Sequence, residues 1–162
     1  LAMAKKDIRY YLNGIHFNNI GGKLRIEATD GSQLFVVNTA LGNDAPDVKF
    51  IVPEVAFKQL PKDPSVEITF NSTTNKVSVG IVTVGAIDGK FPDVDRIIPK
   101  NSASNELAQF DWDRVALGQK VLRTLDGKSS FMYDLQFDGG VNVGRMFSRC
   151  GNAAFYVMPM RR

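Results

Sequence analysis

The stretch DIRYYLNGIHFNNIGGKLRIEATDGSQLFVVNT, residues 7–39, decides the fold. Turn-forming residues divide it at NNIGG and at TDGS, because Gly, Asn and Asp favour tight turns between strands. The runs between these turns are short and rich in aliphatic and aromatic side chains, as β-strands are. The stretch therefore predicts three consecutive strands, over 10–17, 24–28 and 33–39.

The chain then continues with a strand, a helix and three more strands. Pro53 follows a strand that ends at Val52, and proline suits the first position of a helix. Glu54 suits the first turn, where the helix dipole is positive, and Pro61 and Pro64 end the helix after about two turns. The next three strands are expected over 66–70, 76–80 and 81–87.

The second half of the chain repeats this order of elements. A Pro-bounded extended segment over 88–100 and a linker over 101–106 precede a short strand over 107–110. Asp111 suits the N-cap of a helix. The buried stripe of that helix is predicted to contain Val115, Gly118, Leu122 and Leu125. Strands follow over 130–137, 141–147 and 153–158, so a βαβββ unit occurs twice.

The overall composition limits the class of protein. The chain has 162 residues, of which 44% are hydrophobic, and a net charge of +3. No apolar run approaches the ~20 residues of a membrane span, and the N-terminus lacks the apolar core of a signal peptide. We therefore expect a cytoplasmic protein with no membrane partner.

The residues that usually carry catalysis are scarce. His16 and Cys150 are the only histidine and cysteine, too few for a zinc site or a catalytic triad. The run DGKSS at 126–130 is no P-loop, because Leu122 stands where that loop needs its first glycine. We therefore expect no enzymatic activity, no metal and no cofactor.

Four short motifs occur in order along the chain: RYYLNG (9–14), ATDG (28–31), DGKFPDVDRIIPKN (88–101) and VMPMR (157–161). Together they resemble the bacterial sliding clamp, the beta subunit of DNA polymerase III. The resemblance covers nearly the whole chain and implies an α+β, DNA-clamp-like fold built of βαβββ units. Such a fold has antiparallel sheets and, here, two to three short helices. The resemblance also implies a non-catalytic, nucleoid-associated accessory subunit of the polymerase.

The resemblance divides the chain into two modules. Residues 1–100 resemble the middle domain of a clamp subunit without its first strand and most of its first helix. Residues 101–162 resemble half of the last domain. We therefore expect a shortened clamp homologue, and a natural truncation, a mobile-element product and an engineered protein all remain open.

In sliding clamps the C-terminal segment lines a hydrophobic groove that binds linear motifs with Gln, Leu and Phe anchors. Met adapts to different partner side chains, and Pro159 lowers the entropy cost of ordering the tail. The partners so implied are DNA polymerase subunits, the clamp loader and repair proteins; the alternative is that the tail is only an ordered last strand. The groove residues here would be Leu12, Thr29, Gly31, Leu34, Pro92, Arg96, Ile97, Asp111, Arg114, Gly140, Asn142, Tyr156, Val157, Met158, Pro159, Met160 and Arg161.

Five positions depart from the family's pattern. Ser32 and Gln33 stand where the family often has His and Arg. Asp111 and Arg114 stand where Asn and Tyr are common, and Arg162 ends the chain where an apolar residue is usual. Because polar groups at apolar anchor positions cost about 1–3 kcal/mol each, we expect a changed motif preference.

Clamps also surround DNA with helices that carry Lys and Arg, and such phosphate contacts do not depend on base sequence. By this resemblance, double-stranded DNA is a further candidate partner, and aromatic side chains beside cations can stack on unpaired bases. The residues implied are Lys5, Lys6, Arg9, Tyr10 and Tyr11. Further cations on predicted helices, with solvated surface charges as the alternative, are Lys58, Lys62, Lys120 and Arg123. Ring closure and the homo-oligomeric state stay open.

The expected function is therefore in DNA replication. The chain would act as a sliding-clamp-like processivity or docking factor that tethers partners and raises their local concentration. One alternative is a truncated decoy that sequesters these partners without encircling DNA. Another is a simple basic DNA-binding module that uses residues 5–11 and ignores peptides.

Overall fold

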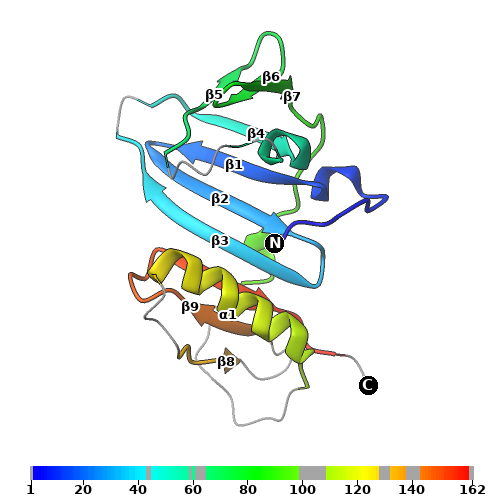
Figure 1. Ribbon diagram of the computed structural model, residues 1–162, viewed down its shortest axis with the longest axis vertical. Coiled ribbons are helices and arrows are strands. Elements are labelled where there is room, and N and C mark those ends of the chain that lie inside the picture. Colours follow the sequence, from blue (N-terminus) through cyan, green and yellow to red (C-terminus); the bar gives the residue numbers. More distant parts are fainter. Residues whose placement is uncertain are drawn as a thin grey trace.

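The computed structural model describes residues 2–42, 45–58, 60, 65–98, 109–127, 132–137 and 143–160. These residues form two antiparallel sheets with one α-helix and three 3-10 helices (Figure 1). The strands are β1 (Gly14–Ile20), β2 (Lys23–Thr29), β3 (Gln33–Ala40), β4 (Val48–Pro53), β5 (Ile68–Asn71), β6 (Lys76–Val79), β7 (Val82–Gly85), β8 (Gln136–Phe137), β9 (Gly144–Phe147) and β10 (Ala153–Val157). The helices are α1 (Trp112–Asp126) and the 3-10 helices η1 (Tyr10–Leu12), η2 (Glu54–Phe57) and η3 (Val94–Arg96).

The larger sheet has seven strands in the order β4-β1-β2-β3-β10-β9-β8. Within it β3 pairs antiparallel with β10, and Leu34 lies opposite Tyr156. This pairing joins segments that are far apart in the sequence into one continuous sheet (Figure 1). The smaller sheet, β5-β6-β7, lies at the β4 end of the larger one.

Helix α1 covers one face of the larger sheet. Its N-cap is Asp111, as predicted, because the Asp111 Oδ1 atom accepts a hydrogen bond of 3.0 Å from the amide of Asp113. Gly118 and Leu122 of the predicted stripe are buried against β10, whereas Leu125 is 49% exposed. Helix η2 covers the same face above β1 and β4, where Ala56 is fully buried.

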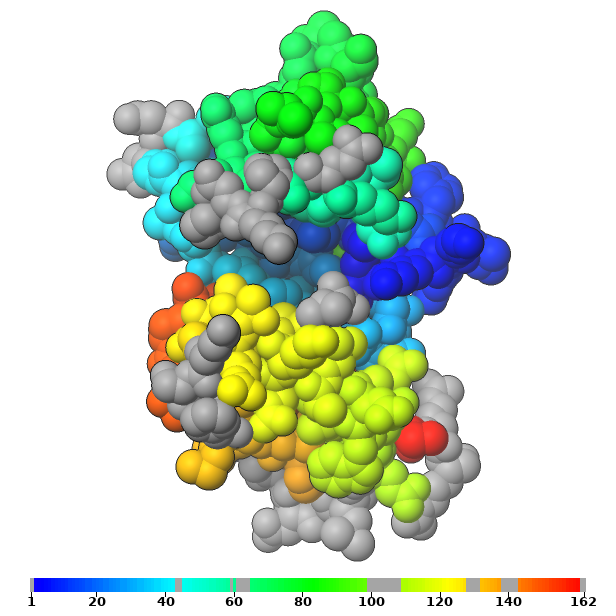
Figure 2. All heavy atoms as spheres, viewed as in Figure 1, coloured from blue at the N-terminus to red at the C-terminus, as the bar shows by residue number. Residues whose placement is uncertain are grey.

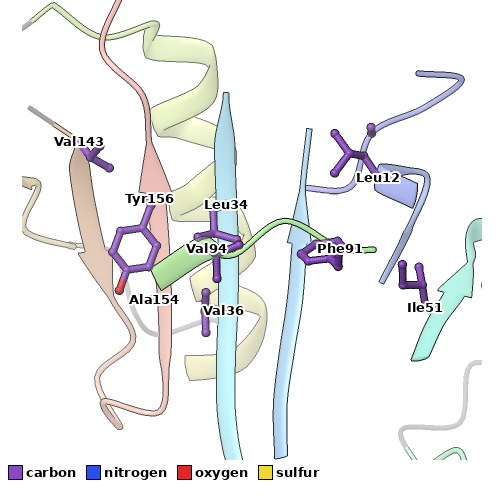
Figure 3. Packing of buried hydrophobic residues seen from close by; sticks show 10 residues of the cluster. Leu12, Leu34, Val36, Ile51, Phe91, Val94, Val143, Ala154 and Tyr156 are labelled. Carbon is purple, nitrogen blue, oxygen red and sulfur yellow. The ribbon is translucent and has the colours of Figure 1, made fainter. Parts of the chain in front are cut away.

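The segment over residues 87–98 covers the opposite face. It starts with a hydrogen bond of 2.9 Å from the Ile87 amide to the carbonyl of Ile51 on β4. It then crosses the sheet toward β10 and buries Phe91 and Val94 (Figure 3). Because this segment runs across the strands, residues of β4 and β10 share one apolar cluster with it.

The predicted strands over 24–28, 33–39 and 76–80 are confirmed to within a residue or two by β2, β3 and β6. The strand predicted over 10–17 is wrong at its start, because Tyr10–Leu12 forms a 3-10 turn. Asn13 explains this turn: its side chain accepts from the Asp7 amide at 2.9 Å and donates to the Asp7 carbonyl at 2.8 Å. These bonds fold the chain back before β1 can begin.

The helix predicted after Pro53 is shorter than expected. Pro53 itself is extended, with ψ of 152°, and pairs with Gly14 as the last residue of β4. Among the described residues directly after Pro53, only the single 3-10 turn η2 forms, and the Lys58 amide closes it with a hydrogen bond of 3.3 Å to the Val55 carbonyl. Pro61 and Pro64 themselves lie outside the described residues.

Two other strands predicted from the sequence are shorter or absent where the structure describes them. In the predicted strand over 130–137, only Gln136–Phe137 pairs among the described residues. In the one predicted over 107–110, the described Gln109 and Phe110 are not in a strand. Phe110 packs instead against Phe137, with ring centroids 6.0 Å apart. Phe110 is therefore apolar because it is buried in the core, and not because it belongs to a strand.

The proposed division at residue 100 stays a prediction. The linker over 101–106 lies outside the described residues, and the β3–β10 pairing carries one sheet across the proposed boundary.

No helix in the part of the chain that the structure describes is long and apolar enough to span a bilayer.

Candidate peptide-binding groove

An apolar cavity of about 200 Å³ lies where four segments meet on the face crossed by residues 87–98. The segments are η1, the β2–β3 turn, η3 and the chain leaving β10. Figure 3 shows Val94 beside Leu34 and Tyr156, with Leu12 further along the same face. The cavity is lined by Arg9, Tyr11, Leu12, Thr29, Gly31, Gln33, Leu34, Pro92, Asp93, Val94, Ile97, Val143, Tyr156 and Met158.

The β2–β3 turn is held by its own side chains. The Thr29 hydroxyl donates to the Gln33 carbonyl at 2.6 Å and accepts from the Gly31 amide at 3.0 Å. Asp30 Oδ1 accepts from the amides of Ser32 and Gln33, at 2.8 and 3.0 Å. These short-range bonds fix the turn that supplies one wall of the groove.

Arg9 lies over this turn at the edge of the groove. The Arg9 Nη2 atom donates a hydrogen bond of 2.7 Å to Asp7 Oδ2. The same nitrogen also donates to the Asp30 carbonyl at 3.1 Å. Hydrogen bonds from Arg9 lower the pKa of Asp7 from 3.8 to about 2. At Gly31, where φ is +92°, a Cβ atom would lie 2.8 Å from Arg9 Nη1, so glycine makes room for the guanidinium.

Helix η3 forms the opposite wall and rests on charged residues of the sheet. Arg25 Nη1 on β2 lies 2.8 Å from Asp95 Oδ1 on η3. The ring of Phe91 stacks on His16, with centroids 4.6 Å apart and planes at 17°. Val94, which points down into the cluster, is only 4% exposed.

The tail after β10 closes the groove. The Met158 amide donates to the Ser32 carbonyl at 2.9 Å, and the Met160 amide to the Gln109 carbonyl at 2.8 Å. Tyr156 is buried under η3, and this burial raises the pKa of its hydroxyl. The positive charges of Arg25 and Arg145 lower that pKa and so offset part of the increase. The backbone of the tail is therefore fixed while the Met158 side chain borders the cavity.

Eight of the seventeen residues predicted for the groove line this cavity: Leu12, Thr29, Gly31, Leu34, Pro92, Ile97, Tyr156 and Met158. Six others are described but do not line it: Arg96, Asp111, Arg114, Val157, Pro159 and Met160. The remaining three, Gly140, Asn142 and Arg161, lie outside the described residues. A binding role for each of these residues stays a prediction.

The residues that do not line the cavity have other places in the structure. Arg114 lies beside the groove, where it pairs with Asp30 at 3.6 Å and with Asp111 at 3.2 Å. Val157 is fully buried on the α1 face. Neighbouring residues of a strand point to opposite faces, so Val157 points away from the groove face to which Tyr156 belongs. Met160 is 59% exposed.

Four lining residues were absent from the sequence-based prediction for either site: Gln33, Asp93, Val94 and Val143. Val94 and Ile97 stand three residues apart, the spacing that places side chains on one face of a 3-10 turn. Gln33 follows the ATDG motif directly, in the turn that the sequence indicated. Nothing in the sequence indicated Val143.

The residues predicted for DNA contact differ in their surroundings, and a DNA-binding role for each stays a prediction. Arg9 and Tyr11 line the groove, whereas Lys5 and Lys6 are exposed and Tyr10 is 57% exposed. Lys5 borders a second hollow of about 490 Å³ between η2 and α1 (Figure 2). Of the further predicted cations, Lys58, Lys120 and Arg123 are exposed, and Lys62 lies outside the described residues.

Metal-ligating side chains do not gather in the described ranges: no three His, Cys, Asp or Glu residues there could hold one ion.

Comparison with known proteins places this geometry in a family. The family model for the DNA polymerase III beta subunit, central domain, matches residues 1–93. The beta sliding clamp of Escherichia coli K12 is 37% identical over 128 residues, covering 75% of this chain and 35% of the relative. That of Proteus mirabilis is 34% identical over 129 residues, with the same two coverages. The chain thus spans about a third of the length of these curated relatives.

Solved structures agree with the fold. The DNA polymerase III subunit beta of Pseudomonas aeruginosa superimposes with a TM-score of 0.77 at 20% identity, covering 99% of this chain and 61% of that one. The Bacillus subtilis sliding clamp gives a TM-score of 0.69 at 14% identity, with coverages of 99% and 60%. These likenesses confirm the clamp-like α+β architecture. With the family match over residues 1–93 and the E. coli relative, they lead to one conclusion: this chain belongs to the DNA polymerase III beta subunit, or beta sliding clamp, family.

Proposed function

We propose that this chain acts in DNA replication as a non-catalytic, clamp-like docking factor whose groove binds linear peptide motifs. Its partners would be polymerase subunits, the clamp loader and repair proteins. It would bind them in the cytoplasm, where the chain would be associated with the nucleoid. The groove would hold a partner near DNA and so raise its local concentration. A Pseudomonas aeruginosa clamp has been solved bound to griselimycin, which supports ligand binding within the family.

The observation that carries this proposal is the convergence of distant segments on one apolar cavity. Leu12, Leu34, Val94 and Met158 come from four different elements and border the same space of about 200 Å³. Such a space accepts one or two apolar side chains of a peptide. The fixed backbone of the tail and the unbranched Met158 combine a rigid frame with an adaptable wall, which suits several related motifs.

The experiment is fluorescence anisotropy with a labelled peptide that carries Gln, Leu and Phe anchors. We expect saturable micromolar binding to the wild type and a loss of about tenfold in Met158→Ala, which removes apolar contact area. Met132→Ala is the matched control, because Met132 is 81% exposed, does not line the cavity and was not predicted for the groove. Absence of binding to the folded wild type would overturn the proposal, as would equal losses in the two variants.

Double-stranded DNA is the second partner that we propose, because exposed cations lie on one face of the sheet. Lys58, the C-cap residue of η2, and Lys120 on α1 both lie on the side of the sheet opposite the groove. Duplex binding that falls steeply with salt and weakens in Lys58→Ala and Lys120→Ala would support it. A decoy would bind the peptide but no DNA at any salt concentration.

A further inference from the structure

The wall of the groove formed by η3 rests on a chain of buried charged side chains. Glu27 on β2 is 3% exposed, and its two carboxylate oxygens have different partners. Oε2 lies 2.7 Å from His16 Nδ1, and Oε1 lies 2.8 Å from Arg25 Nε. Arg25 then reaches out of the sheet to Asp95 on η3, at 2.8 Å. The chain therefore runs from the buried strand surface to the groove wall.

The energetics make Arg25 the central residue of this chain. A buried carboxylate is stable only when it is paired, so the charge of Glu27 holds the Arg25 side chain beside it, with Nε at ion-pair distance but without hydrogen-bond geometry. Only 21% of the Arg25 side chain is exposed, whereas 69% of the Asp95 side chain is. The sheet end of this chain of charges, at Arg25, is thus held rigidly, whereas the exposed end at Asp95 on η3 is the part that needs to be positioned.

Helix η3 needs such positioning because it has few other polar anchors among the residues that the structure describes. Its three residues supply Val94 to the core, and Asp93 caps it weakly, accepting from the Asp95 amide at 3.3 Å. Arg96 pairs with Asp93 at 3.3 Å, and 83% of its side chain is exposed. The Phe91 stack on His16 holds the segment upstream of η3, so both contacts depend on the same pair of strands.

We propose that Arg25, oriented by the buried Glu27, is the positioning residue of the groove: it fixes η3 through Asp95 and thereby sets the affinity for the peptide. The part concerning affinity rests on the proposed function. The part concerning the position of η3 does not, and it is measurable in the protein without ligand.

The test reverses one charge. Asp95→Lys places a cation against Arg25, and Asp88→Lys is the matched control, since Asp88 is exposed in the same segment and the net charge changes equally. In the free protein we expect the amides of Ile97 and Ile98, which both bond the Val94 carbonyl, to exchange about tenfold faster in Asp95→Lys. Amides of β6 should not change, and Asp95→Glu should restore slow exchange.

Peptide anisotropy on the same variants completes the test. We expect Asp95→Lys to weaken binding about tenfold and Asp88→Lys to stay within twofold of the wild type. Unchanged exchange at residues 97–98 in Asp95→Lys would overturn the positioning role, whatever the peptide does. Faster exchange with unchanged affinity would overturn the link between η3 and binding. Failure of the wild type to bind peptide would overturn the proposed function but leave the exchange result decisive for η3.

Discussion

Gly118 of α1 packs directly against the ring of Phe155 on β10, so closely that a Cβ atom at position 118 would collide with it. The same Cβ would lie 2.5 Å from the Met146 Cε atom. The Met146 contact is with its terminal methyl group, which can turn aside, but the ring of Phe155 is fully buried and cannot move without disturbing the core. The absence of one side chain therefore sets the distance between helix and sheet.

The first prediction concerns this contact. Gly118→Ala gains about 1 kcal/mol of helix propensity but overpacks the core by about 1–3 kcal/mol, so we expect net destabilisation. Urea unfolding followed by circular dichroism measures it. Lys120→Ala, at an exposed position of α1, should change the free energy of unfolding by no more than about 0.5 kcal/mol. A Gly118→Ala protein as stable as the wild type would contradict the close approach.

Leu34 serves both the core and the groove. It is 1% exposed and lies opposite Tyr156 across the β3–β10 pairing. Leu34→Ala should lower the free energy of unfolding by about 2–5 kcal/mol through lost burial and a residual cavity. Leu41→Ala is the comparison, because Leu41 is 55% exposed and its removal should have little effect. Similar losses in both variants would place Leu34 outside the core.

Gly31 tests the fit of Arg9 against the β2–β3 turn. Gly31→Ala strains a backbone with φ of +92° and also displaces the Arg9 guanidinium. Gly21→Ala strains a backbone with φ of +56° but meets no atom within 4 Å. We therefore expect Gly31→Ala to be the more destabilising in thermal unfolding, with the strain alone costing about 1–2 kcal/mol at each site. The reverse order would argue against the Arg9 contact.

The Asp7–Arg9 pair predicts a pH dependence with a definite sign. The pKa of Asp7 is lowered to about 2 from 3.8, so its contribution is complete above pH 3.8 and is lost as the pH falls through about 2. Carboxyl NMR titration of Asp7 should give the low value in the wild type and a higher value in Arg9→Ala, still below 3.8 because the amide of residue 9 continues to donate to the Asp7 carboxylate. An unshifted Asp7 in the wild type would show that the pair is absent in solution.

Much of the fold follows from local sequence. The turn residues of 18–22 and 29–32 place the ends of β1, β2 and β3, and Asp111 marks the start of α1 through its own side chain. The errors arose where distant or side-chain contacts decided the structure. The Asn13 amide folds residues 10–12 into a turn, although their aromatic and aliphatic side chains are typical of a strand.

The candidate groove divides in the same way. Motifs along the chain indicated Leu12, Leu34, Ile97 and Met158, and the structure brings these together around one cavity. The motifs did not indicate that Val143 completes the wall. They assigned Arg9 and Tyr11 to DNA contact, which stays a prediction, and did not indicate that both residues line the groove. Contact with the β2–β3 turn, rather than residue type, decided the place of Arg9.

The sequence by itself therefore determined the succession of most strands along the chain, the turns between β1, β2 and β3, the N-cap of α1 and the family, because each depends on residues close in the chain or on motifs read in order. Only the tertiary structure decided that β3 pairs with β10, that Gly118 meets Phe155 and that Arg25 reaches Asp95. Pairings between distant segments depend on packing and on the burial of paired charges, which no local pattern encodes. These distant contacts form the groove and hold its walls.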